Sequence, residues 1–356
     1  MIKKIKVLIV DDSAFMRKSL SLMLSSDPDI EVIGTAKDGL EGLELNRKLL
    51  PDLVTLDIEM PRMDGLTALQ KIMAERPVPV LMVSSLTTDG ADATIKAMEL
   101  GAVDFIPKEL SFVNVNIINI KEDLIQKVKS IVKQNELKLR LNRLRGVSQK
   151  KDIPAPVKTL ENRLPVKSYK AIAIGISTGG PLSLQKVIPY FSKNINCPIF
   201  IVQHMPPKFT KSLADRLNTL SVLEVKEAEN AELVKNGTVY FAPGGYHMLL
   251  DYSTTGGVRI KISEEPSTTL HRPSVDVMLN SVIKVYGKNT LGVIMTGMGR
   301  DGCDAMKELK NIGGTTIAQD EESCVVYGMP KAVVDANLAD VIAPLEKIPT
   351  IINMAF

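Results

Sequence analysis

Residues 171–181 read Ala-Ile-Ala-Ile-Gly-Ile-Ser-Thr-Gly-Gly-Pro, an apolar run followed by a glycine-rich bend that holds one serine. A helical pattern opens at Pro181, so this order predicts a buried strand, a tight turn and a helix, with the Ser177 hydroxyl exposed at the strand's carboxyl end. Glycines accept the backbone angles of tight turns. The helix N-terminus beyond offers N–H groups to a developing oxyanion. A phosphate-binding or purely structural turn would show the same pattern, so the motif alone leaves both alternatives open.

The second half of the chain continues this alternation of strand-like and helix-like segments. Apolar runs predict strands at residues 171–174, 199–202, 291–295 and 315–318, and helical patterns cover residues 182–188, 210–217, 275–285 and 304–309. The middle, residues 224–263, looks strand-rich. These segments predict an α/β domain built on a doubly wound, mostly parallel sheet.

The first half shows five strand–helix units. Strand-like runs lie at residues 6–10, 30–36, 53–56, 80–83 and 103–106, and helical patterns lie at residues 14–24, 40–49, 66–74 and 92–100, with a fifth from about 118. Such units predict a doubly wound five-stranded parallel sheet of the flavodoxin-like type. Ligands of these sheets bind at the carboxyl ends of the strands.

Length and composition indicate two globular domains and a linker. The 356 residues suggest two domains, and we place them at residues 1–125 and 168–356. Residues 126–167 then form a helix and a polar linker, because a basic, leucine-rich stretch is followed by a segment with three prolines. The basic stretch could instead contact a membrane or an acidic partner.

Charge, aromatic content and cysteines narrow the function classes. A net charge of +3 is too small to imply nucleic acid, and 4% aromatic residues offer few stacking platforms for single strands. No apolar stretch reaches the roughly 18 residues of a membrane span, so we expect no membrane insertion. The three cysteines are widely spaced and unpaired by any CxxC motif. They predict free thiols and a cytoplasmic location.

Polar residues that suit a cation and a phosphoryl group follow the predicted strands of the first half. Asp11 and Asp12 follow the first strand and Asp57 follows the third, and in a parallel sheet these ends converge. Clustered carboxylates repel one another unless a cation is present, and oxygen ligands suit Mg²⁺. Ser84 and Lys108, after the last two strands, would help bind a phosphoryl group on Asp57. Taken singly, the paired aspartates or the serine after them could cap a helix, and the lysine could be an ordinary surface residue.

Four motifs of this half resemble the receiver domain of bacterial response regulators, over about residues 5–122. They are Val10-Asp11-Asp12-Ser13, Leu56-Asp57-Ile58-Glu59-Met60-Pro61-Arg62-Met63-Asp64-Gly65, Val83-Ser84-Ser85 and Phe105-Ile106-Pro107-Lys108. The resemblance implies phosphorylation of Asp57 by a histidine kinase. It also implies Mg²⁺ bound by Asp12, Asp57 and the backbone carbonyl of Glu59, beside Asp11.

The same resemblance implies a phosphorylation switch made of Ser84, Lys108 and Phe105. One departure is Glu109, where many receivers have proline after the lysine. We expect this change to affect the local conformation of the loop and not the charge of the lysine.

A serine nucleophile needs a base, and the chain has three histidines. His204 follows a predicted strand, as Ser177 does, whereas His247 lies in the strand-rich middle and His271 at a helix entry. Position favours His204 and leaves the other two open. Asp301 lies in a glycine-rich loop after another predicted strand and could orient the base, or it could cap the helix that follows.

Four motifs of the second half resemble the catalytic domain of the chemotaxis protein-glutamate methylesterases, over about residues 168–352. They are Gly175-Ile176-Ser177-Thr178-Gly179-Gly180, Gln203-His204-Met205-Pro206, His271-Arg272-Pro273-Ser274 and Thr296-Gly297-Met298-Gly299-Arg300-Asp301-Gly302. The resemblance implies that Ser177 is the nucleophile, His204 the general base and then acid, and Asp301 the residue that orients it. Met298, through its amide, and Thr178 are the implied oxyanion and substrate residues.

The resemblance also implies the reaction and its partners. We expect hydrolysis of glutamate γ-methyl esters on methylated chemoreceptors, deamidation of receptor glutamines, a chemotaxis histidine kinase as phosphodonor, and no cofactor for hydrolysis. Two other classes stay open: a response regulator whose second domain binds a phosphate or nucleotide at the Ser177 turn, and a DNA-binding output driven by the basic linker. No helix-turn-helix pattern supports the latter.

Overall fold

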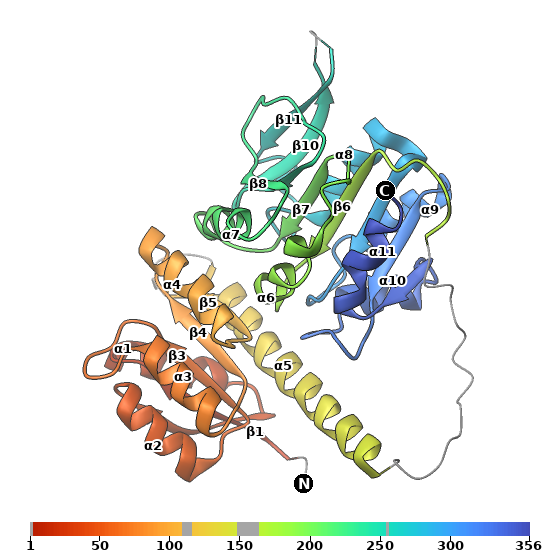
Figure 1. The fold of residues 1–356 in the computed structure, drawn as a ribbon. Helices are drawn as coiled ribbons and strands as arrows, with labels where there is room; N and C mark the ends of the chain where they lie inside the picture. The colour runs from red at the N-terminus through yellow and green to blue at the C-terminus, as the bar shows by residue number, and fades with distance from the viewer. Residues whose placement is uncertain (1–2, 109–115, 148–163, 254–255) are drawn as a thin grey trace. The chain divides into compact units, whose positions relative to one another are not determined.

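The computed structural model describes residues 3–108, 116–147, 164–253 and 256–356, and only the backbone of residues 116–119 and 142–147. The chain divides into two compact units, Met1–Val147 and Ser148–Phe356. Each is an α/β unit built on a parallel sheet (Figure 1), which confirms the predicted fold class. The departure at Glu109 and most of the predicted linker lie outside the described residues.

The first unit is a five-stranded parallel sheet in the order β2-β1-β3-β4-β5. Its strands are β1 (Ile5–Val10), β2 (Ile30–Ala36), β3 (Leu53–Asp57), β4 (Val80–Ser84) and β5 (Asp104–Pro107), and its helices are α1 (Ala14–Leu24), α2 (Gly39–Leu49), α3 (Gly65–Glu75), α4 (Thr88–Glu99) and α5 (Asn116–Val147). Strands β3 and β4 are buried along their whole length, as expected of strands covered on both faces. The helix α5 runs without a break through the predicted boundary at residue 125.

Polar caps begin the helices of this unit. Ser13 Oγ accepts from Met16 N at the start of α1, and Asp38, Asp64 and Thr87 cap α2, α3 and α4 in the same way. Ser13 therefore fills the capping role that the sequence left open, and the neighbouring carboxylates are not needed for it.

The second unit is a seven-stranded parallel sheet in the order β14-β13-β12-β6-β7-β9-β8, with a separate antiparallel pair, β10 and β11. The strands of the sheet are β6 (Ala171–Ile176), β7 (Ile199–Gln203), β8 (Glu224–Glu227), β9 (Thr238–Phe241), β12 (Thr290–Ile294), β13 (Thr315–Gln319) and β14 (Val341–Ala343), and those of the pair are β10 (His247–Tyr252) and β11 (Val258–Ser263). The α-helices are α6 (Gly180–Gln185), α7 (Phe209–Asn218), α8 (Val275–Tyr286), α9 (Cys303–Asn311), α10 (Met329–Asp335) and α11 (Ile348–Asn353).

In each parallel sheet, the side on which successive strands are added reverses at one pair of central strands. The first sheet grows from β1 toward β2 on one side and toward β3 on the other, and the second grows from β6 toward β7 on one side and from β12 on the other. The carboxyl ends of strands at such switch points are the usual ligand sites of doubly wound sheets. Asp11, Asp12 and Asp57 lie at the first of these places and Ser177 and Asp301 at the second, and the other predicted site residues lie on or just after these or nearby strands.

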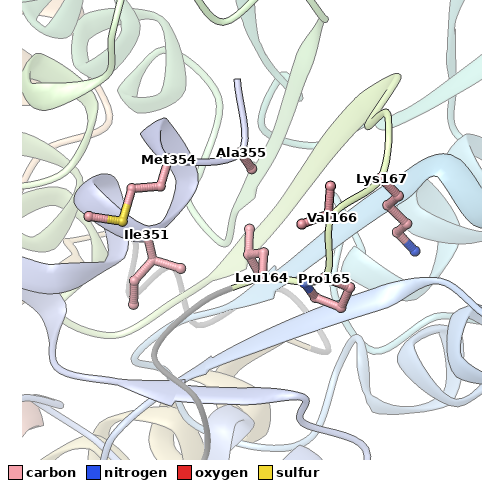
Figure 2. Close-up of a pocket in the computed structure, with 7 residues that line it drawn as sticks. All are labelled: Leu164, Pro165, Val166, Lys167, Ile351, Met354 and Ala355. Atoms are coloured by element: carbon pink, nitrogen blue, oxygen red, sulfur yellow. The ribbon is translucent and has the colours of Figure 1, made fainter.

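An apolar groove of about 460 Å³ lies elsewhere on the second unit. Figure 2 shows it between residues 164–167 and the C-terminal residues Ile351, Met354 and Ala355. The Lys167 ammonium donates to the carbonyls of Lys288 and Gly313. None of the predicted site residues lines this groove. Among the described residues, no helix combines the length and the apolar character that crossing a bilayer requires.

Candidate active site

An acidic cluster occupies the switch point of the first unit. Carboxylate oxygens of Asp11, Asp12 and Asp57 all lie within 4.8 Å of one another. Asp11 and Asp57 are buried and Asp12 is exposed. Lys108 Nζ lies 2.5 Å from Asp57 Oδ2 and 3.9 Å from Asp11 Oδ2. The structure therefore brings together the carboxylates and the lysine that the sequence placed at strand ends.

Burial sets the electrostatics of this cluster. It raises the pKa of Asp57 to about 6, against the opposing effect of Lys108, and the charge of Asp11 adds to the increase. Burial also raises the pKa of Asp11. Among the described residues, Asp11 Oδ2 accepts no hydrogen bond. Three close oxygen ligands with too few donors fit a hard cation such as Mg²⁺.

The other predicted switch residues, Ser84 and Phe105, form hydrogen bonds to neighbouring helices. Ser84 is buried, and its Oγ lies 2.8 Å from Thr94 Oγ1 and 3.1 Å from the carbonyl of Gly90, both on α4. Phe105 is buried, and its carbonyl accepts from Lys127 Nζ at 3.0 Å. The backbone N–H of Glu59 donates to Asp57 Oδ1 at 3.3 Å.

Ser177 follows β6, and the adjacent strands hold its backbone. Its N–H donates to the Thr296 carbonyl (3.0 Å), after β12, and its carbonyl accepts from Gln203 Nε2 (3.0 Å), at the end of β7. A Cβ added at Gly297 would lie 2.8 Å from the Ser177 Cβ, so a glycine is needed for this close approach. Ser177 is half-buried at the carboxyl end of the central strand.

His204 and Asp301 are in direct contact. His204 follows β7, and its backbone N–H donates to the Ile176 carbonyl, next to Ser177, at 3.2 Å. His204 Nε2 lies 2.8 Å from Asp301 Oδ2. Within the described ranges, the buried Nδ1 of His204 has no hydrogen-bond partner. The structure thus unites His204 with Asp301, whereas no hydrogen bond joins His204 to the Ser177 side chain.

Asp301 receives several donors besides His204. Oδ2 accepts from Val275 N (2.7 Å), and Oδ1 accepts from Ser274 Oγ (2.9 Å) and Asp276 N (3.1 Å). Burial alone would raise the pKa of Asp301, but the contact with His204 and these backbone donors outweigh burial and hold the pKa below its usual range. The carboxylate accordingly stays ionised.

Asp301 does not cap the helix that follows it, as one alternative from the sequence proposed. Gly302 is the N-cap of α9 and has no side chain to cap it, and the first-turn N–H of Ala305 donates to Asp276 Oδ1 (2.8 Å) and not to Asp301. Asp301 instead accepts from N–H groups at the start of α8. The carboxylate therefore joins the beginning of α8 to His204.

The other two histidines are placed differently from His204. His247 is fully buried; its Nδ1 accepts from Ser274 N (3.2 Å), and its Nε2 lies 3.2 Å from the Pro266 carbonyl. Both ring nitrogens are thus engaged by backbone groups, which leaves none for a serine. The ring of His271 stacks on that of His204, with centroids 4.2 Å apart.

Two further groups lie near the serine. Thr178 is buried, and within the part of the chain that the structure describes its Oγ1 has no hydrogen-bond partner. The loop after β12 places Met298 directly after Gly297, which approaches Ser177 closely. The contacts of Gln203 and Ser274 were not predicted from the sequence, and His247, a candidate base there, was not expected to hold Ser274. Gln203 and Ser274 belong to quoted motifs, and their presence there was the available signal.

The two units define a response regulator with an enzymatic output domain. Residues 7–117 match the response regulator receiver domain, and residues 172–352 match the CheB methylesterase domain. The protein-glutamate methylesterase/protein-glutamine glutaminase of Pyrococcus horikoshii is 48% identical over 98% of this chain and 92% of its own length. The enzyme of the same description from Lawsonia intracellularis is 49% identical over 96% of this chain and 97% of its own. The chain belongs to the CheB methylesterase family.

A solved structure supports the assignment of the second unit. The crystal structure of the Thermotoga maritima CheB methylesterase catalytic domain is 46% identical, with a TM-score of 0.51, and covers 53% of this chain and 100% of that one. The second unit is therefore the hydrolase part of the molecule.

Proposed function

We propose that this enzyme removes methyl groups from glutamate γ-methyl esters of chemoreceptors, releases methanol and acts in chemotactic adaptation in the cytoplasm. The observation that carries the proposal is the 2.8 Å contact between His204 and Asp301 on strand ends that flank the one holding Ser177. The names of the relatives, protein-glutamate methylesterase/protein-glutamine glutaminase, support the same substrate chemistry.

The geometry suggests a role for each nitrogen of His204. Nε2 faces an ionised carboxylate, so it carries the proton and donates to Asp301. Nδ1 then holds the lone pair and is the base that removes the Ser177 proton. The hydrogen bond between Nδ1 and Ser177 Oγ would form when substrate binds, since catalytic contacts are often loose before that step.

The reaction then proceeds through an acyl-enzyme. Ser177 Oγ attacks the side-chain carbonyl carbon, and the oxyanion accepts hydrogen bonds from the Met298 amide, with Thr178 beside it. His204 gives its proton to the leaving methoxide, and methanol departs. Water, activated by the same imidazole, then hydrolyses the glutamyl ester of Ser177.

The same site would deamidate receptor glutamines. The amide nitrogen leaves as ammonia after protonation by His204, and the two reactions share the acyl-enzyme. Methoxide is the better leaving group, so we expect the esterase reaction to be faster.

Phosphorylation of Asp57 would control this activity. A chemotaxis histidine kinase is the expected phosphodonor, and Asp12, Asp57 and the Glu59 carbonyl would hold Mg²⁺, which neutralises charge on the transferred group. The phosphoryl group adds about −1.5 to −2 charges, which Lys108 can pair with. We infer that the unphosphorylated receiver restricts access of the receptor to Ser177.

A methanol-release assay on methylated receptor tests the proposed function. Wild-type protein should release methanol faster with acetyl phosphate and Mg²⁺, and Ser177→Ala should release almost none under either condition. A variant at Ser177 with normal turnover would exclude the acyl-enzyme. A protein that binds receptor without releasing methanol would favour the binding-module alternative.

A further inference from the structure

Asp301 depends on a side chain outside the catalytic residues just proposed. Ser274, the N-cap of α8, donates through Oγ to Asp301 Oδ1 at 2.9 Å. Ser274 is buried, with 4% of its surface exposed. Together with the N–H groups of Val275 and Asp276, this buried hydroxyl fixes the rotation of the Asp301 carboxylate, and the rotation decides where Oδ2 points. Oδ2 is the atom that contacts His204.

The backbone of Ser274 is in turn held by His247. Ser274 N donates to His247 Nδ1 at 3.2 Å. A backbone N–H can only donate, so Nδ1 must hold the lone pair and the ring proton must be on Nε2. That proton points toward the Pro266 carbonyl at 3.2 Å, with Thr269 Oγ1 equally near. One tautomer of His247 thus satisfies both neighbours.

The burial of His247 agrees with this tautomer. Its side chain is fully buried at the start of β10, and burial lowers its pKa. A charged ring would place an N–H against the N–H of Ser274. The ring is therefore an acceptor for Ser274 and has no free nitrogen for proton transfer with substrate.

We propose that Ser274 and His247 are positioning residues of the hydrolytic site: His247 holds Ser274, and the Ser274 hydroxyl sets the orientation of Asp301 toward His204. The inference rests on the proposed function, because it assigns a task relative to the His204–Asp301 pair. Neither residue touches the reacting atoms. Their removal should reduce the rate of the chemical step and leave receptor binding almost unchanged.

Two variants of Ser274 separate its hydrogen bond from its capping role. Ser274→Gly removes the hydroxyl, but glycine is well tolerated at the N-cap of a helix. Ser274→Thr keeps both a hydroxyl and a cap. A hydrogen bond to a charged group predicts an about 10- to 100-fold loss of kcat for the glycine variant, with KM for methylated receptor within about twofold of wild type, and recovery for the threonine variant.

Two variants of His247 form a second matched pair. In His247→Asn the amide oxygen can take the place of Nδ1 and accept from Ser274 N, whereas in His247→Gln the amide can take the place of Nε2 and reach only the Pro266 side. We expect the asparagine variant to retain more kcat than the glutamine variant. If Ser274→Gly does not fold, the comparison of the two His247 variants tests the proposal.

The experiment measures methanol release and the rate of Ser177 labelling by a fluorophosphonate in the full chain, with Ser177→Ala as reference. The inference is supported if Ser274→Gly lowers kcat and labelling rate while Ser274→Thr restores them. It is overturned if the glycine variant matches wild type, if only KM changes, or if the two His247 variants are equal. Activity or labelling that persists in Ser177→Ala would instead overturn the proposed function.

Discussion

Asp57 is buried and the Asp301 side chain is 11% exposed, and both carboxylates lie at the switch point of a doubly wound parallel sheet, yet their environments shift the pKa in opposite directions. Burial raises the pKa of Asp57 to about 6, with Asp11 close by and Lys108 as its main cationic partner. Burial would raise the pKa of Asp301, but His204 and the backbone N–H groups of Val275 and Asp276 hold it below its usual range. The number of donors, more than the depth of burial, separates the two sites.

This difference indicates what each site is built to do. The Asp57 cluster has more negative charge than its donors can satisfy, so it gains stability from an added cation. The lone pairs of Asp301 are filled, so the carboxylate can orient and stabilise an imidazolium without accepting its proton. The following predictions test the contrast, beginning with the largest expected effect.

Removal of the proposed nucleophile, Ser177, should have the largest effect. We expect Ser177→Ala to lower methanol release by roughly 10³-fold or more, since the groups of a triad act as a unit. Phosphorylation of Asp57 by acetyl phosphate, measured by mass spectrometry, should be unchanged and serves as the control. Residual turnover within about tenfold of wild type would contradict the contrast between a chemical and a regulatory site.

Loss of the charge of Asp301 should have the next largest effect. Asp301→Asn places an amide among donors and can reverse the tautomer of His204, so we expect kcat to fall by about 10³- to 10⁴-fold. The matched change Asp304→Asn, on the exposed start of α9, should leave kcat near the wild-type value. Equal effects of the two substitutions would show that Asp301 has no special task.

The corresponding change at Asp57 should affect activation alone. In Asp57→Asn, basal methanol release should remain, whereas stimulation by acetyl phosphate with Mg²⁺ should be lost. A coupling of about 1–3 kcal/mol predicts that stimulation of the wild type is roughly 5- to 150-fold. The assay compares both proteins with and without the phosphodonor. Equal stimulation of both would remove Asp57 from the switch.

The smallest predicted effect is on stability. The pKa of Asp57 in the folded state, about 6, exceeds the ordinary value of 3.8, so the folded state binds the extra proton between these values. Its stability therefore falls as pH rises through this range and stays reduced above pH 6. In metal-free protein at pH 7–8, Asp57→Asn should increase the free energy of unfolding by roughly 1–3 kcal/mol, and Mg²⁺ should reduce the difference.

Hydrogen exchange of β3 measures this effect in the full chain. Wild type and variant are compared at the same pH, so the intrinsic exchange rates cancel. Protection should be greater in the variant at pH 7–8 and equal below about pH 4. Equal protection at every pH would mean that the buried Asp57 carboxylate does not destabilise the folded state.

Much of the fold follows from local patterns. The apolar runs at residues 30–36 and 199–202 recur as β2 and β7 almost residue for residue. Helix α4 begins at Thr88, four residues before its apolar pattern, because Thr87 caps it. Strand β14 has only three residues and α10 has no side-chain cap, so neither gave a clear local signal.

The site residues also divide into those that local sequence could place and those that it could not. Ser177, Asp57 and His204 could be placed at strand ends because each follows an apolar run. Their roles, and the domain boundaries at residues 125 and 168, stay predictions. The links from His247 to Ser274 and from Ser274 to Asp301 each span 27 residues along the chain. Such contacts arise from packing between distant elements, which one sequence does not reveal.

The most direct test of the central claim is the identification of the residue that a fluorophosphonate modifies, by peptide mass spectrometry of the intact chain. We expect one adduct, on Ser177, that forms at least about 100-fold more slowly in Asp301→Asn. Hydrolysis of the methyl ester without modification of Ser177, or modification at an equal rate in both proteins, would contradict it.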